Sequence, residues 1–168
     1  MASKTTNRTV HCACGSVELA TIGEQIISAV CYCDDCQAAA VQLEERPNAP
    51  PVLDGIGGTE FLLYRKDRMD CIKGSEHLEN HRLTEASTTK RVVASCCSTY
   101  LFLDFQKGHW FSMHRARFDG PTPAPKMRIQ TKSKPEGAVL PDDVPAYPTF
   151  PMKFLAILVM ARLKMFIS

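Results

Sequence analysis

The sequence predicts a mainly β domain that is followed by a proline-rich arm and a C-terminal helix. Short β-favouring runs, separated by turn signals such as Gly15 and Gly23, dominate the first two thirds of the 168 residues. Eight of the eleven prolines then fall between residues 120 and 151, and proline removes backbone donors that regular structure needs. We therefore divide the chain into a lead at 1–8, a main domain at 9–119, an arm at 120–151 and a helix at 152–168.

The main domain is expected to contain several short strands and one helix. The helix is predicted over the alanine-rich stretch Gln37–Glu45, because Pro47 disfavours helical conformation in the residue before it. Strands are expected at Thr9–Val10, Val17–Leu19, Ile26–Ile27, Phe61–Tyr64, Met69–Ile72, His81–Thr84, Arg91–Ala94, Tyr100–Phe105 and Trp110–Met113.

The terminal helix is predicted over Lys153–Phe166, which holds good helix formers and neither glycine nor proline. Its wholly apolar run, 154–161, has only eight residues, whereas a membrane-spanning helix needs about 20. Packing on the domain or on a second copy is favoured over membrane contact, although basic residues flank the apolar run. The sequence therefore leaves open whether the chain forms a homodimer.

Charge and cysteine usage narrow the function classes. The net charge of +2 gives no basis for nucleic acid as the main partner. The first ten residues are polar and lack the apolar stretch of a secretory signal, so we expect a cytoplasmic protein. Disulfides are rare in that compartment, and eight cysteines in 168 residues therefore favour metal binding or thiol chemistry.

Seven of the eight cysteines lie in three short clusters. Cys12 and Cys14 have the spacing that points two side chains to the same face of a strand. Cys31, Cys33 and Cys36 combine this spacing with a C-x-x-C turn, so three thiolates could hold one zinc ion and leave its fourth position open. Three protein ligands with one exchangeable position are typical of a catalytic zinc.

The third cluster, Cys96-Cys97, could supply two ligands to one ion only if the backbone turns there, because neighbouring residues on a strand face opposite sides. At least one of the two is expected to complete a site with Cys12 and Cys14. Cys71 stands alone and is expected to be a buried, inert thiol.

Polar residues near these clusters receive weaker assignments. His11 is expected to point away from its neighbour in the first cluster, in a surface or supporting role. Asp34 and Asp35 lie inside the second cluster, where turn chemistry is favoured over a role as general base.

Together these motifs resemble the glutathione-dependent formaldehyde-activating (GFA) family, which also includes the centromere protein V group. The match consists of C-x-C-G at Cys12–Gly15, C-x-C-x-x-C at Cys31–Cys36 and a later cysteine motif followed by Ser98-Thr99. It covers roughly residues 9–105 and leaves the arm and the terminal helix outside.

The resemblance implies a mainly β, Mss4-like zinc-binding fold with two zinc ions. It implies a structural zinc held by Cys12 and Cys14 together with Cys96, Cys97 or both, and an active-site zinc at the catalytic residues Cys31, Cys33 and Cys36. The implied chemistry is that of a carbon–sulfur lyase, which joins a small thiol, glutathione, to formaldehyde. Zinc would supply Lewis acidity and lower the pKa of the bound thiol.

The sequence departs from the family pattern at both sites. Ala94 stands where the family has the first cysteine of its late C-x-x-C motif, and Cys96 is the substitute. Tyr32 and Gln37 stand where the family often has histidine and arginine, and the missing arginine removes a partner for a glutathione carboxylate.

Three functions follow from the clusters. The first is an enzyme that acts on a thiol adduct at the three-cysteine site. The second is an interaction module in which both zinc ions are structural, favoured by the arm and the apolar terminal helix. The third, weaker reading is a thiol redox switch at Cys96-Cys97 or Cys33–Cys36.

Overall fold

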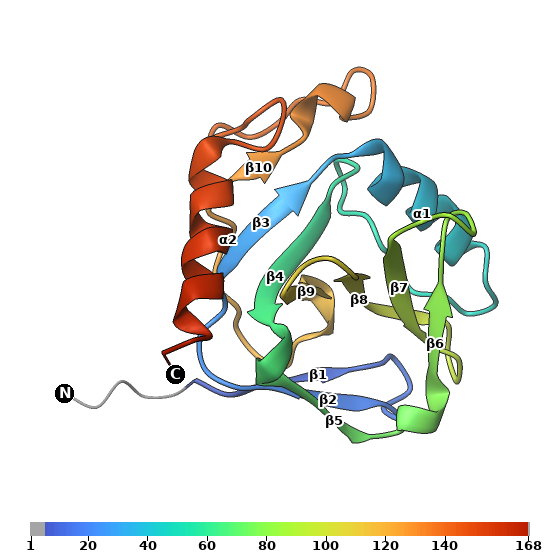
Figure 1. Ribbon diagram of the computed structural model, residues 1–168. Coiled ribbons are helices and arrows are strands. Elements are labelled where there is room, and N and C mark those ends of the chain that lie inside the picture. Colours follow the sequence, from blue (N-terminus) through green and yellow to red (C-terminus); the bar gives the residue numbers. More distant parts are fainter. Residues whose placement is uncertain (1–5, 168) are drawn as a thin grey trace.

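The computed structural model describes residues 6–167 and confirms a mainly β architecture with a C-terminal helix (Figure 1). Residues 1–5 of the predicted lead, and Ser168 at the end of the predicted terminal segment, lie outside the described residues. One sheet has three antiparallel strands in the order β1-β2-β5, namely β1 (Arg8–His11), β2 (Glu18–Thr21) and β5 (Met69–Lys73).

The second sheet has seven strands in the order β10-β3-β4-β9-β8-β7-β6. They are β10 (Arg128–Ile129), β3 (Ile27–Cys31), β4 (Thr59–Arg65), β9 (Trp110–His114), β8 (Thr99–Phe105), β7 (Thr89–Ala94) and β6 (Leu78–His81). The short 3-10 helices are η1 (Lys66–Arg68), η2 (Ser75–His77), η3 (Arg115–Arg117) and η4 (Thr131–Ser133). All pairings are antiparallel except that of β10 with β3.

Three groups of buried side chains hold these layers together. One group lies between the two sheets and includes Leu19, Leu62 and Leu101, none of which is exposed. A second lies between β3, β4 and the terminal helix, and a third lies under the first helix. Every residue of β3 is buried, so this strand is covered on both faces.

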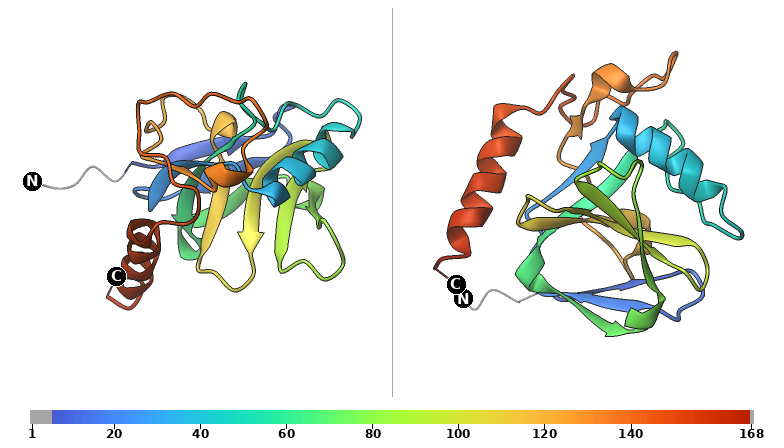
Figure 2. Two further views of the ribbon diagram at one scale, coloured as in Figure 1. Left: turned by 90° about the horizontal axis from the view of Figure 1, so that it is seen from above. Right: turned by 45° about the vertical axis from the view of Figure 1, so that its right-hand side comes forward.

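The terminal helix, α2 (Met152–Lys164), packs along the β3 and β10 edge of the large sheet (Figures 1 and 2). Its buried residues, Phe154, Leu158 and Ala161, recur at helical spacing and so form one face. Among residues 6–167, no helix has both the length and the apolar character needed to cross a membrane.

The first helix, α1 (Asp34–Glu44), begins three residues earlier than the sequence analysis predicts. Cys33 is its N-cap, and the Cys33 Sγ accepts a hydrogen bond from the Cys36 N–H over 3.4 Å. Asp34 and Asp35 therefore lie in the first helical turn, where the helix dipole favours negative charge, and not in an irregular turn.

The strand predicted over His81–Thr84 is shifted: β6 spans Leu78–His81. The residues after His81 form a local turn in which the Ser87 Oγ lies 3.1 Å from both the backbone N and the Oγ1 of Thr84. Side-chain hydrogen bonds of this kind compete with strand pairing, which explains why the β run ends early.

The proline-rich arm is irregular along most of its length but contributes the short parallel strand β10. The Val30 N–H donates to the Met127 carbonyl over 3.1 Å, and the Tyr32 N–H donates to the Ile129 carbonyl over 3.1 Å. On its other side, β10 exchanges hydrogen bonds of 2.9 Å with Pro145 and Tyr147. The arm thereby fixes the strand that leads into the second cysteine cluster.

Candidate metal centres

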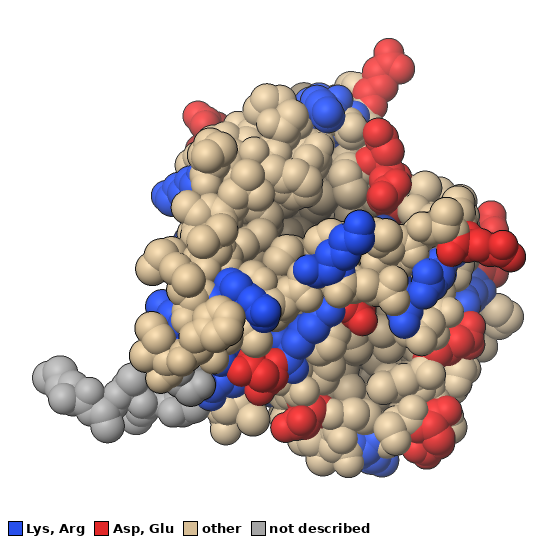
Figure 3. Space-filling model, in the orientation of Figure 1, with Lys and Arg blue, Asp and Glu red and all other residues tan. Residues whose placement is uncertain are grey.

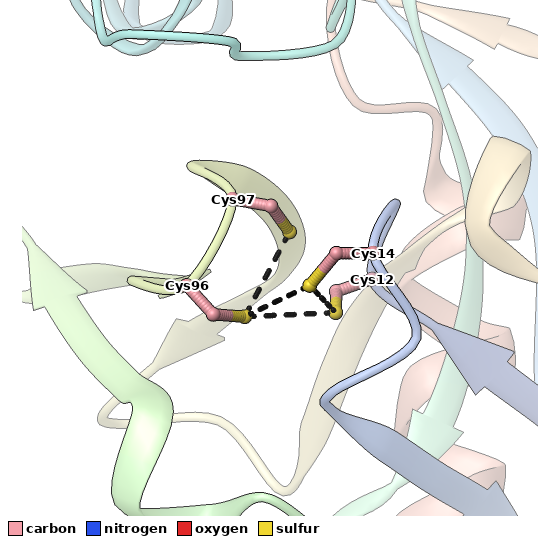
Figure 4. A group of neighbouring side chains, drawn as sticks. All are labelled: Cys12, Cys14, Cys96 and Cys97. Atoms are coloured by element: carbon pink, nitrogen blue, oxygen red, sulfur yellow. Dashed lines mark hydrogen bonds between the residues drawn. The ribbon is translucent and has the colours of Figure 1, made fainter.

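The first candidate metal centre gathers four thiols from two distant segments of the chain (Figure 4). Cys12 and Cys14 follow β1, whereas Cys96 and Cys97 lie in the turn between β7 and β8. The four Sγ atoms all lie within 4.8 Å of one another, and none of the eight cysteines forms a disulfide. We call this group the four-cysteine cluster.

The spacing of these sulfur atoms suits a tetrahedral ion. The Sγ of Cys12 lies 3.6 Å from that of Cys14 and 3.8 Å from that of Cys96. The Sγ of Cys96 lies 3.4 Å from that of Cys14 and 3.8 Å from that of Cys97. Four sulfurs at about 2.3 Å from a zinc ion would lie about 3.8 Å apart, so the cluster could hold a metal ion.

Backbone turns bring both adjacent cysteines into this cluster. Ser98 adopts a left-handed conformation with φ 55°, which reverses the chain directly after Cys97. Thr99 then ties the two segments together, because its Oγ1 accepts the Ala13 N–H over 3.0 Å. Gly15, with φ 76°, allows the corresponding turn after Cys14.

The residues around the four-cysteine cluster are not metal ligands in this arrangement, but some of them contact it. The Nε2 of His11 lies 2.6 Å from an Asp119 carboxylate oxygen, and His11 is not part of the sulfur group. Hydrogen bonds with Ser16 lower the pKa of Cys14 to about 6, which favours its thiolate form at neutral pH. Cys71 lies in β5, partly buried against the core, and belongs to neither cluster.

The second candidate metal centre, here called the three-cysteine cluster, sits where β3 meets α1. Cys31 ends β3, Cys33 caps α1 and Cys36 lies in its first turn, with all three Sγ atoms within 4.8 Å of one another. Within residues 6–167, no fourth cysteine, histidine or carboxylate joins this group. The three thiols could therefore hold a metal ion with one position left for another ligand.

Hydrogen bonds give the three thiols different pKa values. Those from Cys31 and Cys36 lower the pKa of Cys33 to about 3, and the backbone N–H at the start of α1 acts in the same direction. The hydrogen bonds with Cys33 and Cys36, together with burial, raise the pKa of Cys31. The arrangement thus favours a negative charge on the three-cysteine cluster, with the lowest pKa at Cys33.

The three-cysteine cluster forms part of the wall of a cavity of about 390 Å³. Strands of the large sheet supply one side, and Phe150 with the α2 residues Phe154, Leu155 and Leu158 supplies the other. The space-filling view shows a hollow bordered mainly by uncharged atoms between α2 and the strands (Figure 3). No cysteine of the four-cysteine cluster lines this cavity.

Two polar side chains near the cavity have roles that the sequence analysis did not assign. Arg91 of β7 is 2% exposed, lines the cavity and donates from Nη2 to the Asp35 carbonyl over 3.1 Å. Gln37 donates from Nε2 to the carbonyls of Tyr32 and Ser133, and so links the cysteine-bearing turn to the arm. Arg91 belongs to no recognisable motif, whereas Gln37 directly follows the C-x-C-x-x-C motif, and only the fold brings both residues to their hydrogen-bond partners.

Fold and thiols thus define a mainly β protein with two cysteine clusters that could each hold a metal ion. The chain belongs to a family of unknown function, DUF6151, whose family model matches residues 3–162. A comparison with curated proteins gives no match. Among solved structures, a Rhodobacter sphaeroides protein from a structural genomics programme is similar, with 17% identity and a TM-score of 0.49. The similarity covers 68% of this chain and 91% of that chain.

Proposed function

We propose that this chain is a zinc-dependent enzyme that makes or breaks a carbon–sulfur bond in a thiol adduct. The observation that carries this proposal is the contrast between the two clusters. The four-cysteine cluster offers four ligands, the number that a structural zinc site uses, and none of its cysteines lines the cavity of about 390 Å³. The three-cysteine cluster lacks a fourth ligand among residues 6–167 and opens onto a cavity.

Soft thiolate donors at these separations suit zinc, which we propose as the ion at both clusters. When bound, zinc would supply Lewis acidity and lower the pKa of a substrate thiol. Cys31, Cys33 and Cys36 would hold the ion, and the apolar walls would exclude water from the reacting atoms.

The reaction requires the movement of one proton. When a thiol adds to an aldehyde, the sulfur bonds to the carbonyl carbon, and the thiol proton is transferred to the carbonyl oxygen. Asp35 is the only acidic residue among the described residues that line the cavity, so we propose it as the group that accepts and returns this proton.

The resemblance of the cysteine motifs to the GFA family supports this reaction class, and we propose that the chain is a divergent relative of that family. The cytoplasmic location expected from the sequence accords with free, metal-binding thiols.

Turnover tests the proposal. Zinc-loaded protein is incubated with formaldehyde and either glutathione or a small alkyl thiol, and the hydroxymethyl thioether adduct is followed by NMR. We expect a rate above the protein-free background. The Cys33→Ser substitution should lower this rate to the background. Cys71→Ser, a thiol outside both clusters, should retain the rate. Background rates with every thiol would refute the enzyme assignment.

An interaction module is the second candidate, because one face of α2 remains apolar and exposed. Met152, Val159 and Leu163 are 79%, 59% and 50% exposed. If zinc at the three-cysteine cluster is inert to every added thiol while the protein self-associates through α2, the module replaces the enzyme. Analytical ultracentrifugation of the intact protein and of Val159→Lys measures that self-association.

A further inference from the structure

The cavity beside the three-cysteine cluster is built for an apolar molecule. Aromatic and aliphatic side chains from the sheet, the arm and α2 form most of its lining, including Phe61, Trp110, Ile129 and Leu158. At about 390 Å³ its volume lies in the range of small-molecule sites, which spans about 300–1,000 Å³.

One buried cation interrupts this apolar lining. Arg91 is 2% exposed, and its Nη1 has no hydrogen-bond partner among the described residues. No carboxylate oxygen of residues 6–167 lies within ion-pair distance of it. The charge of Arg91 acts on the nearby thiols of Cys33 and Cys36, whose pKa values it lowers, but the buried Nη1 still lacks an acceptor in the described part of the chain. An unsatisfied buried donor is costly, so an anionic oxygen of a ligand beside the guanidinium would stabilise it.

Resting on the proposed function, we propose that the substrate is a small, mainly apolar thiol with one carboxylate, which Arg91 binds. The sulfur of this ligand would take the open position at the three-cysteine cluster. Its hydrocarbon part would lie against the aromatic side chains under α2, and its carboxylate would lie beside the guanidinium of Arg91 at the cavity wall.

A mainly apolar cavity with a single arginine does not suit glutathione, the thiol that the family resemblance implies. Glutathione carries two carboxylates and one ammonium group, whereas Arg91 is the only cation and Asp35 the only anion among the described lining residues. Gln37, at the position where the family often has arginine, is already engaged with two backbone carbonyls. Even if Asp35 pairs with the ammonium, one glutathione carboxylate has no cationic partner in the described lining, and burying it would weaken binding.

Binding to the cobalt-loaded protein tests the inference without relying on turnover. The visible bands of Co²⁺ report a new sulfur ligand, so the protein is titrated with 6-mercaptohexanoate, hexanethiol and glutathione. We expect 6-mercaptohexanoate to bind about tenfold or more tightly than either competitor. Arg91→Met should reduce its affinity about tenfold or more and leave that of hexanethiol unchanged.

A pair of helix variants gives a second test if Arg91→Met fails to fold. Leu155 on α2 lines the cavity, whereas Val159, one turn further, does not. Leu155→Asn should weaken both alkyl thiols several-fold, and Val159→Asn should change neither. Both side chains are partly exposed, at 42% and 59%, so both variants should keep the fold.

The outcomes separate this inference from the proposed function. If no thiol changes the cobalt spectrum, the open metal position is absent and both proposals fail. If thiols bind but glutathione binds as tightly as 6-mercaptohexanoate, only the substrate class is overturned. Equal losses for both alkyl thiols in Arg91→Met would mean that Arg91 acts on the metal cluster alone, which also overturns the inference.

Discussion

His114 should make the free energy of unfolding fall as the pH drops below about 6.5. This residue ends β9 and is 3% exposed. Its Nε2 donates to the Val52 carbonyl over 2.9 Å, and its Nδ1 is buried without a partner among the described residues. This arrangement accommodates the neutral imidazole and leaves no acceptor for a second proton.

The size of the effect follows from the pKa. Burial lowers the pKa of His114 from 6.5 to about 4. Above pH 6.5 the residue is neutral in both states, whereas between 6.5 and 4 the unfolded chain binds a proton that the folded chain excludes. Each pKa unit corresponds to about 1.36 kcal/mol, so stability should decline by about 3 kcal/mol across this window and remain level below it.

Urea unfolding of the metal-loaded protein at a series of pH values measures this decline. His114→Gln retains an N–H donor but cannot take up a proton. Between pH 6.5 and 4, its free energy of unfolding should therefore fall by about 3 kcal/mol less than that of the parent protein. His77→Gln is the matched control, because the His77 side chain is 38% exposed. Loss of metal at low pH affects all three proteins and cancels in the comparison. Equal pH dependence of the parent protein and His114→Gln would refute the reasoning.

Three further predictions concern the metal and the core. Elemental analysis should find about two zinc ions per chain, about one in Cys31→Ser and about two in Cys71→Ser, and unchanged stoichiometry in Cys31→Ser would contradict the assignment of ligands. Gly58→Ala should lower the unfolding free energy by about 1–3 kcal/mol, because its Cβ would lie 2.5 Å from Val30 Cγ1, and a denaturation midpoint equal to that of the parent would exclude this clash. Leu62→Ala removes a side chain with no exposed area and should cost about 2–5 kcal/mol, measured by thermal or urea unfolding; a loss below 1 kcal/mol would show that the core refills the space.

Much of the fold could be predicted from local sequence. The terminal helix follows from composition, and α2 begins at Met152, one residue before the expected start. Most strands overlap their predicted ranges because β-branched and aromatic runs mark them directly. The early start of α1 was missed because a cysteine is an unusual N-cap, and the thiol role of Cys33 hid its capping role.

The candidate sites likewise have one part that local sequence predicts and another that it does not. Close sequence spacing identified Cys31, Cys33 and Cys36 as a group, and the structure places their sulfurs together. The cavity could not be predicted, because its walls come from strands between β3 and β10 and from α2, which only tertiary packing brings together. Arg91 was missed for the same reason, since its neighbours in sequence give no indication that a buried cation faces the thiols.

The two halves of the three-cysteine site are encoded far apart. Its sulfur donors occupy six residues near the start of the chain, whereas the α2 part of its wall lies more than a hundred residues later. Substitutions in α2 could therefore alter the cavity and leave the three thiols unchanged, and substitutions among the thiols could leave the α2 wall unchanged. Classification of related proteins by cysteine spacing alone would group them by their thiol clusters, and the sequence of α2 would be needed to group them by the lining of the cavity.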